Sequence, residues 1–395
     1  MTAPIKQHLI DPEICIRCYT CEMTCPEQAI EHDDNNVVVD VTKCNHCMDC
    51  IAPCPTGSID NWRVVAEPYS LEEQYEWMEL PEEQPLPEGG DTNIEAMDEA
   101  VAALLAEAHA GAGGRVKAPA SAAKPSVGIA TQAKPALATV QGNYRLTAED
   151  ADADIRHLIL SLGETYFPVL EGQSVGIVPP GARPDGGPHH PRLYSVSSPR
   201  DGERPQTNNL SLTVKREPDG LASNYVCDLK KGDQVPLIGP FGSTFLLPND
   251  AQAHCVMICT GTGSAPFRGF TMRRQRTVPS AKGSLTLFFG ARTPQALPYF
   301  GPLGKVPDSF LAKHFAFSRV DGQPKEYVQD KMRAQHEALA ARLQDDKTHL
   351  YVCGLKAMEA GVEQALEDVA RQHGLDWQAI RTQMREEGRY HVETY

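Results

Sequence analysis

The chain lacks the long apolar segments that membrane proteins and secretory precursors carry. None of its 395 residues belong to an apolar run of membrane-spanning length. Residues 1–10 contain no apolar core of signal-peptide length. We therefore expect a cytoplasmic protein without a membrane partner.

Positive charge is also scarce. The sequence has 37 Lys and Arg against 52 Asp and Glu, a formal net charge of −15. This balance argues against nucleic-acid binding, which needs a basic surface. The repeated Glu-x-x-His pattern of a di-iron helix pair is missing too. With 41% hydrophobic residues the chain is globular, and its length predicts about two to four domains.

Cysteine is the residue that is unusually placed. Eight of the 12 cysteines fall in two tight C-x2-C-x2-C-x3-C runs, followed by Pro26 and Pro55. Such runs fit metal ligation in a reducing compartment better than disulfides. In a two-cluster arrangement, three thiolates of one run bind one four-iron cluster and the fourth binds the other cluster.

Two ligand sets follow from this rule. One [4Fe–4S] cluster is expected on Cys15, Cys18, Cys21 and Cys54, and the second on Cys44, Cys47, Cys50 and Cys25. Two zinc ribbons are the alternative, although zinc rarely needs four thiolates at this spacing twice. Between the runs, residues 37–39 form a predicted short strand after a turn at residues 33–36.

The composition then changes. Residues 67–99 are rich in Glu and Pro, and residues 118–138 in Ala, Pro, Lys and Ser, so both segments read as linker or disordered arm. Apolar residues at helical spacing predict a helix over 94–108, ended by glycines at 111–114. Such a helix docks a partner or caps a neighbouring domain. The predicted segments are 1–66 (cluster domain), 67–141 (linker with a short helix), 142–250 (β-barrel) and 251–395 (α/β domain).

The third segment has the pattern of a small antiparallel barrel. Short apolar stretches at 158–160, 174–178, 193–196 and 210–214 are separated by Gly and Pro turns.

The stretch from Arg192 to Pro199 has the features of a flavin site. Arg192 and Tyr194 lie on one strand face, because side chains alternate with period 2. Arg192 can donate two hydrogen bonds to a pyrophosphate, Tyr194 can stack on a planar ring, and Ser195 adds a hydroxyl. Residues 220–224 precede a predicted helix to residue 229, whose N-terminus, with the free hydroxyl of Ser223, suits a phosphate.

The last segment alternates strands and helices, as a doubly wound parallel sheet does. Strands are predicted at 255–259, 285–290 and 350–353. Residues 260–266 form a Gly-rich loop that leads into a helix through residue 270, which suits a pyrophosphate even though G-x-G-x-x-G spacing is missing.

One group of residues in this segment points to a nucleotide with a 2′-phosphate, and one cysteine lies where ligands bind in such sheets. Ser318, Arg319, Lys325 and Tyr327 place a hydroxyl, two cations and a ring near one strand end, although each alone reads as a solvated loop residue. Cys353 ends a strand at the carboxyl edge, where ligands bind in such sheets. Cys255 and Cys259 read as small core residues instead.

These motifs carry two family resemblances. Residues from about 143 to 395 resemble the plant-type ferredoxin–NADP reductases, and residues from about 5 to 63 resemble the bacterial two-cluster ferredoxins. The first resemblance implies FAD and NADPH as cofactors, with Tyr194 on one flavin face and Tyr395 on the other until nicotinamide displaces it. It places the hydride path among Ser195, Cys353, Glu393 and Tyr395.

The same resemblance implies the contacts with both cofactors. The residues concerned are Arg192, Leu193, Tyr194, Ser195, Thr213, Val214, Lys215, Leu221, Ala222, Ser223, Thr262, Gly263, Ala291, Arg292, Ser318, Arg319, Lys325, Tyr327, Gln329, Gly354, Leu355, Glu393 and Tyr395. Arg192 and Ser223 would bind FAD phosphates, and Lys215 those of NADP.

The fusion of the two modules, together with residues 6–18, resembles the reductase components of two-component oxygenases. It implies that electrons from NADPH pass through FAD and two [4Fe–4S] clusters to a separate di-iron oxygenase. Another oxygenase or a soluble carrier as acceptor, reverse operation toward NADP, and a non-catalytic redox sensor remain open alternatives.

Overall fold

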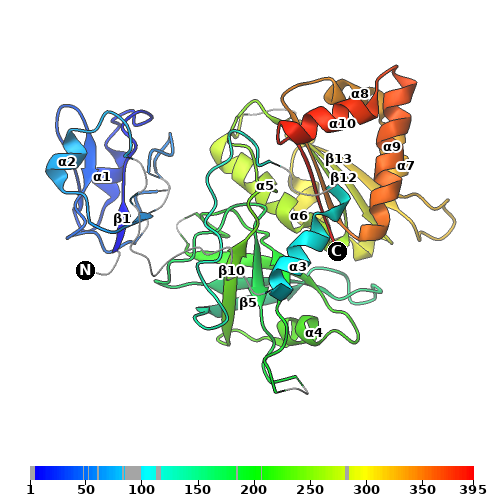
Figure 1. Ribbon diagram of the computed structural model, residues 1–395, viewed down its shortest axis with the longest axis horizontal. Helices are drawn as coiled ribbons and strands as arrows, with labels where there is room; N and C mark the ends of the chain where they lie inside the picture. The colour runs from blue at the N-terminus through cyan, green and yellow to red at the C-terminus, as the bar shows by residue number, and fades with distance from the viewer. Residues whose placement is uncertain are drawn as a thin grey trace. The chain divides into compact units, whose positions relative to one another are not determined.

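A computed structural model describes residues 5–47, 49–51, 53–59, 62–81, 84, 99–112, 117–183, 186–205, 207–280 and 284–395. Contacts divide the chain into two units (Figure 1). The first comprises Met1–Asn93 with Asp201–Asn209, and the second comprises Ile94–Arg200 with Leu210–Tyr395.

The first unit is built from two small antiparallel strand pairs. Strand β1 (Ile5–His8) pairs with β4 (Trp62–Val65), and β2 (Ile30–His32) pairs with β3 (Val37–Val39). The predicted strand at 37–39 is therefore confirmed. The Asp33 carboxylate makes the turn before it, since it accepts hydrogen bonds from the N–H groups of Asn35 and Asn36 (2.7 and 2.6 Å). Helix α1 (Thr20–Thr24) lies within the first cysteine run.

The linker assignment is wrong for residues 67–81. They contain helix α2 (Leu71–Tyr75), which Ser70 and Glu73 begin with a capping box. The buried Gln74 amide accepts a hydrogen bond from the Val39 N–H and donates one to the Val39 carbonyl (both 3.0 Å). These bonds satisfy the edge of β3, so the segment belongs to the first unit.

The second unit begins with a helix before the barrel. Helix α3 (Glu99–Ala108) covers residues 99–108 of the predicted helix, whose residues 94–98 lie outside the described part of the chain, and the short helix η2 (Ala110–Ala112) follows it. The linker assignment is also wrong for the stretch that follows residue 117. Ala130 forms a β-bridge with Gly239, and the Ser121 carbonyl accepts a hydrogen bond from the Asn249 N–H (3.2 Å).

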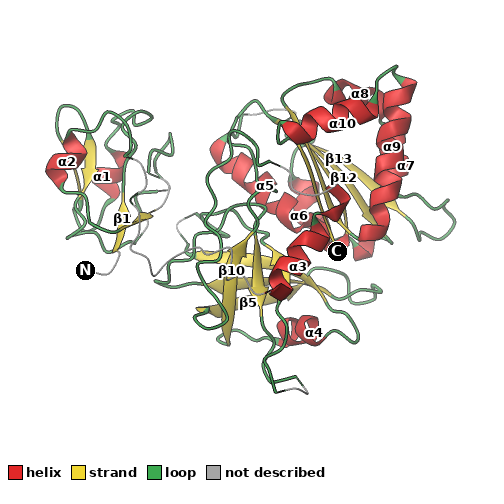
Figure 2. Ribbon diagram, in the orientation of Figure 1, coloured by secondary structure: helices red, strands yellow, loops and turns green. Residues whose placement is uncertain are grey.

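The expected antiparallel sheet is present, with strand order β8-β7-β10-β5-β6-β9. Its neighbouring strands β10 and β5 are labelled in Figure 2. Its strands are β5 (Ala136–Arg145), β6 (Ile155–Ser161), β7 (Ser174–Ile177), β8 (Arg192–Ser195), β9 (Asn209–Lys215) and β10 (Gln234–Phe241). A bridge between Val196 and Leu212 joins the ends of the strand order, which is the contact that closure into a barrel requires. Helix α4 (Leu221–Asp228) follows β9.

The expected parallel sheet follows, with order β13-β12-β11-β14-β15. Its strands are β11 (His254–Thr260), β12 (Leu285–Ala291), β13 (Leu311–Phe317), β14 (Thr348–Gly354) and β15 (Tyr390–Thr394). All four pairings are parallel, so the carboxyl ends of the strands lie along one edge.

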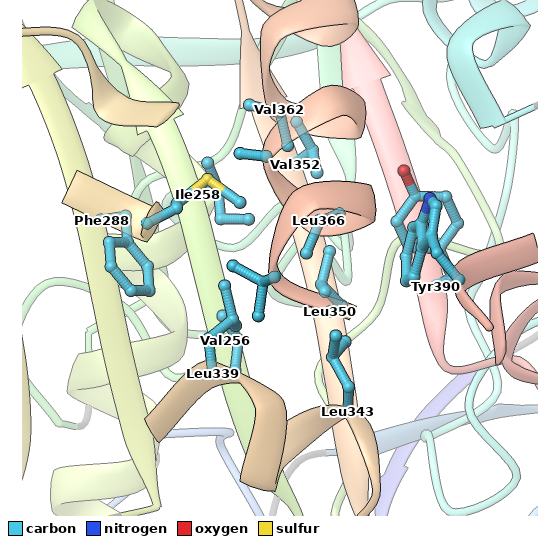
Figure 3. Packing of buried hydrophobic residues seen from close by; sticks show 14 of the residues in the cluster. Val256, Ile258, Phe288, Leu339, Leu343, Leu350, Val352, Val362, Leu366 and Tyr390 are labelled. Carbon is cyan, nitrogen blue, oxygen red and sulfur yellow. The ribbon is translucent and has the colours of Figure 1, made fainter. Parts of the chain in front are cut away.

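Helices cover both faces of this sheet, as its buried strands require. The helical elements are η3 (Gly261–Gly263), α5 (Ser264–Thr277), η4 (Pro294–Ala296), α6 (Phe300–Lys305), α7 (Val328–Ala334), α8 (His336–Leu343), η5 (Lys356–Met358), α9 (Glu359–Gln372) and α10 (Trp377–Glu386). Val256 and Ile258 pack with Leu366 of α9 on one face (Figure 3), and Met257 packs with Phe270 of α5 on the other. Within the described residues, no helix is both long and apolar enough to cross a membrane.

Candidate active site

The first unit gathers cysteines from both runs. One pocket is lined by Cys25 of the first run together with Cys44, Cys47 and Cys50 of the second. This is the set expected for the second cluster. Ala29, Ile30 and Val39 complete much of the apolar wall.

The other cysteines are also near one another. Burial, with added charge from Cys54 and Cys15, raises the pKa of the Cys21 thiol to about 11. That electrostatic influence places Cys54 beside the first run, as the other expected set requires. Among the described residues, no three or more Cys, His, Asp or Glu side chains lie close enough to hold one metal ion. A four-iron cluster needs no such set, because each of its thiolates binds a different iron.

Strand β8 carries the predicted flavin residues on the antiparallel sheet. Arg192 is exposed and donates to the Pro191 carbonyl (3.1 Å), while Tyr194 is half-buried, which raises the pKa of its hydroxyl. Ser195 accepts a hydrogen bond from Ser174 (3.5 Å) on neighbouring β7. Strand alternation puts Arg192 and Tyr194 on one face, as expected.

The phosphate turn before α4 differs from the prediction in one detail. The Ser223 hydroxyl is not free, because it donates to the Gly220 carbonyl (3.1 Å) and accepts from the Glu217 N–H (3.0 Å). Gly220 gives α4 no side-chain cap, so the helix N-terminus retains backbone donors for a phosphate. Lys215 also meets Glu217, at 2.6 Å.

Thr213 and Val214 face protein rather than an open surface. The Thr213 hydroxyl is 2.6 Å from that of Tyr299, which also lies 2.9 Å from Nδ1 of His157. Val214 lies in the core of the antiparallel sheet. Sequence reasoning missed Tyr299, a buried residue that joins this sheet to the parallel-sheet segment.

The Gly-rich loop lies against the strand that carries Cys353. A Cβ on Gly263 would meet the Cys353 carbonyl, so only glycine allows η3 to approach β14 this closely. The neighbouring Thr262 hydroxyl is 2.6 Å from that of Tyr395. The loop therefore contacts the C-terminal tyrosine, a residue that is 55% exposed.

Three of the four predicted catalytic residues come together at this edge. Cys353 and Glu393 are register partners on β14 and β15, and the Tyr395 N–H donates to the Gly354 carbonyl (3.0 Å). Burial and then the Glu393 charge raise the pKa of the Cys353 thiol well above its ordinary value. Cys353 is therefore a protonated thiol rather than a nucleophilic thiolate. Ser195, the fourth residue, comes from β8.

Glu393 has a hydrogen-bond partner that sequence reasoning missed. The imidazole Nε2 of His109 donates to its carboxylate at 3.0 Å. The two residues are 284 positions apart, and His109 follows α3, so no local sequence pattern indicates this contact.

The predicted 2′-phosphate residues gather at the ends of β12 and β13. The Ala291 and Arg292 carbonyls accept hydrogen bonds from the N–H groups of Ser318 and Arg319 (3.1 and 2.8 Å). The Glu326 N–H donates to the Phe317 carbonyl (3.1 Å), which brings in the flanking Lys325 and Tyr327. The Gln329 amide lies against α9, and Leu355 is exposed near Thr260.

A carboxylate already sits between the two arginines of this group. Asp152 lies 3.3 Å from Arg292 and 3.5 Å from Arg319. Both guanidinium groups thus contact the same carboxylate, an arrangement in which two arginines share one anion. Sequence reasoning missed Asp152, which precedes β6.

Comparison with known proteins finds matches for both the N-terminal and the C-terminal part of the chain. Residues 7–55 match the 4Fe-4S dicluster domain family, and residues 257–364 match the Oxidoreductase NAD-binding domain family. The chain is 39% identical over 272 residues to the cyanelle ferredoxin–NADP reductase of Cyanophora paradoxa, covering 64% of this chain and 74% of that protein. It is 34% identical over 288 residues to the ferredoxin–NADP reductase of a Spirulina species, covering 68% and 98%.

A solved structure agrees in fold. The ferredoxin–NADP+ reductase from Plasmodium falciparum aligns with a TM-score of 0.55 at 24% identity, covering 68% of this chain and 99% of that one.

Proposed function

Because the chain belongs to the ferredoxin–NADP reductase family and also carries a 4Fe–4S dicluster domain, we propose that it passes electrons from NADPH to a partner oxygenase. The observation that carries this proposal is the pocket that joins Cys25 with Cys44, Cys47 and Cys50. In an NADP-dependent oxidoreductase that also carries a cluster site, the two electrons of NADPH can leave the protein one at a time through the clusters.

The residues present fit the implied groups. The cysteine-lined pocket and the Cys15, Cys18, Cys21 and Cys54 set would hold two [4Fe–4S] clusters. Arg192 and the N-terminus of α4 would bind the FAD phosphates. Arg292 and Arg319, which contact Asp152 in this structure, would bind the 2′-phosphate. When bound, FAD would supply the conversion between paired and single electrons.

The chain's own contribution is to position and shield the reacting groups. Tyr194 and Tyr395 would flank the flavin ring, and the Thr262 hydroxyl holds Tyr395 at the Gly-rich loop. Cys353 keeps its proton because it is buried beside Glu393. Ser195 would complete the polar lining of the hydride path.

The proposed acceptor is a separate di-iron oxygenase that epoxidises benzoyl-CoA. It rests on the resemblance of the fused layout and of residues 6–18 to the reductase component of benzoyl-CoA oxygenase. No stretch of this sequence identifies a coenzyme A site of its own, which is consistent with substrate binding by the partner.

Purification from cells grown on benzoate, followed by identification of copurifying proteins, tests the partner. A di-iron oxygenase supports the proposal, whereas another acceptor replaces it with a different reductase role. Metal analysis of the same sample should find roughly eight iron and eight sulfide per flavin. Zinc in place of iron would overturn the cluster assignment. Steady NADPH turnover with an artificial acceptor would exclude the redox-sensor alternative.

A further inference from the structure

Helix α3 packs across two strands that carry predicted site residues. Helix α3, which is labelled in Figure 1, contacts β8, which holds Arg192 to Ser195, and β15, which holds Glu393. Val101 of α3 is 1% exposed and packs with Ile238 and Phe241, with Leu105 and Leu193 against the same cluster. The helix precedes residue 143, from which the sequence motifs resemble the plant-type reductases.

His109, which follows the last residue of α3, contacts Glu393. The His109 N–H donates to the Leu105 carbonyl (3.1 Å), which fixes its backbone to the last turn of α3. Its Nε2 donates to Glu393 Oε1 (3.0 Å), with the two side chains only 23% and 11% exposed. A helix C-terminus also favours a cation at this position.

We propose that His109 is a positioning residue of the reductase site, which fixes the Glu393 carboxylate opposite Cys353. This inference rests on the proposed function for the place of Glu393 beside the hydride path. It makes the segment before the barrel a working part of the active site rather than a spacer.

The charged and titratable groups near His109 have other hydrogen-bond or ion-pair partners, so the contact that fixes Glu393 is the one made by His109. Glu107 of α3 pairs with Lys356 of η5 (3.8 Å), and Glu359 of α9 accepts a hydrogen bond from Thr394 and lies against Gly111. His391 of β15 donates to the Gly388 carbonyl (2.9 Å). Burial, and then the neighbouring His349, lowers the pKa of His391 to about 3, so it stays neutral.

The contact should respond to pH in one direction. The hydrogen bond to Glu393 raises the pKa of His109 above its ordinary 6.5, although burial opposes it. The charged pair is therefore complete below pH 6.5 and is lost as pH rises through the raised pKa. Above that pKa a neutral hydrogen bond remains.

The test is stopped-flow reduction of the flavin by NADPH in full-length holoprotein across this pH range. His109→Ala should lower the limiting rate roughly tenfold with little change in NADPH affinity, because orientation is lost rather than binding. His109→Gln keeps an N–H donor, so it should restore the rate at neutral pH while losing the wild-type inflection above pH 6.5. Glu107→Gln, on the same helix, is the matched control and should keep the wild-type profile.

A second readout does not depend on turnover. Hydrogen exchange of the His109 ring, followed by mass spectrometry, should give a pKa above 6.5 that falls in Glu393→Gln. The inference is overturned if His109→Ala keeps the wild-type rate and inflection, or if Glu107→Gln loses as much as His109→Ala. If the wild-type flavin is not reduced by NADPH at all, the proposed function fails instead.

Discussion

At the scale of single residues, the proposed nucleotide site contains a carboxylate that would compete with its ligand. Asp152 contacts both Arg292 and Arg319, the cations expected to bind the 2′-phosphate. All three side chains are at least half exposed, so each ion pair is worth at most about 1 kcal/mol. In the proposed site NADPH would displace this carboxylate, whereas NADH would gain nothing from doing so.

Asp152→Asn should therefore tighten NADPH binding by about two- to fivefold, because a weak exposed ion pair is removed from the free protein. Arg319→Gln should have the opposite sign and weaken NADPH binding, since it removes a charge-assisted partner. Titration of each variant with NADPH and NADH measures both effects. Asp150→Asn in the same loop is the control. Equal changes for NADH would place the 2′-phosphate elsewhere.

Between elements, one buried ion pair lies beside α5 and joins the segment before β7 to the segment after β8. Glu171 is fully buried and accepts from the Arg200 backbone N–H (2.7 Å) and guanidinium (2.8 Å), next to Gly269 of α5. Burial acts to raise the pKa of Glu171, but the charges of Arg200 and Arg273 outweigh it, so the pKa is lowered. The stabilisation is thus present above the ordinary 4.5 and is lost as pH falls through the lowered value.

Glu171→Gln should lower the free energy of unfolding of the second unit by about 3–5 kcal/mol near neutral pH, because it removes the buried negative charge that faces Arg200. The difference from wild type should shrink only when pH falls below 4.5. Urea unfolding at a series of pH values measures this. Glu367→Gln, an exposed carboxylate on α9, should change little. A constant difference down to low pH would mean that the carboxylate is not ionised in the folded protein.

The first unit needs the segment that composition marks as linker. Gln74 and Asn36 connect α2 to β3, and β3 lies beside the cysteine-lined pocket. A fragment ending at residue 66 loses these hydrogen bonds, while one ending at residue 81 keeps them. The shorter fragment should be less stable by about 1–3 kcal/mol, the cost of leaving buried polar groups unpaired.

Reconstituted fragments 1–66 and 1–81 can be compared by urea unfolding and by loss of cluster absorbance. Gln74→Leu in the longer fragment should reproduce much of the effect of truncation, whereas Glu72→Gln on the same helix should not. Equal stability of the two fragments would show that the segment packs without supporting the fold.

Elements with strong local patterns could be predicted from the sequence. Strand β11 extends the predicted strand 255–259 by one residue at each end, because a continuous apolar run specifies a buried strand. The cysteine sets follow from spacing alone. The packing of residues 67–81 against the first unit could not be predicted. It depends on the hydrogen bonds of the single residue Gln74, whereas the composition of the whole segment resembles that of a linker.

At the scale of the whole molecule, the contacts that the sequence could not predict are those between distant segments. Asp152 lies 140 positions from Arg292, and His109 lies 284 positions from Glu393. Each pair depends on how complete elements fold together, which periodicity does not encode. In each pair, one residue is predicted from a sequence motif (Arg292 and Glu393) and the other lies in a segment without a motif (Asp152 and His109). The proposed site therefore includes residues outside the reductase motifs.

The order of the proposed cofactor sites along the chain predicts a relay in which the clusters are the required exit for electrons. Cys15→Ala and Cys44→Ala each remove one proposed ligand, from the first and the second set, and should compromise that cluster. Reduction of the flavin by NADPH should survive, because Cys353, Glu393 and Tyr395 belong to the second unit. Delivery of electrons to the oxygenase should fail.

The measurement is paired: stopped-flow flavin bleaching by NADPH, and NADPH consumption coupled to benzoyl-CoA turnover with the oxygenase added. Cys227→Ala is the matched control, since this buried thiol lies on α4 in the core of the antiparallel sheet and belongs to neither cysteine run. It should keep both activities. If a variant verified to lack its clusters still supported coupled turnover at the wild-type rate, the flavin would feed the partner directly. The dicluster domain would then serve to dock the partner rather than to carry its electrons.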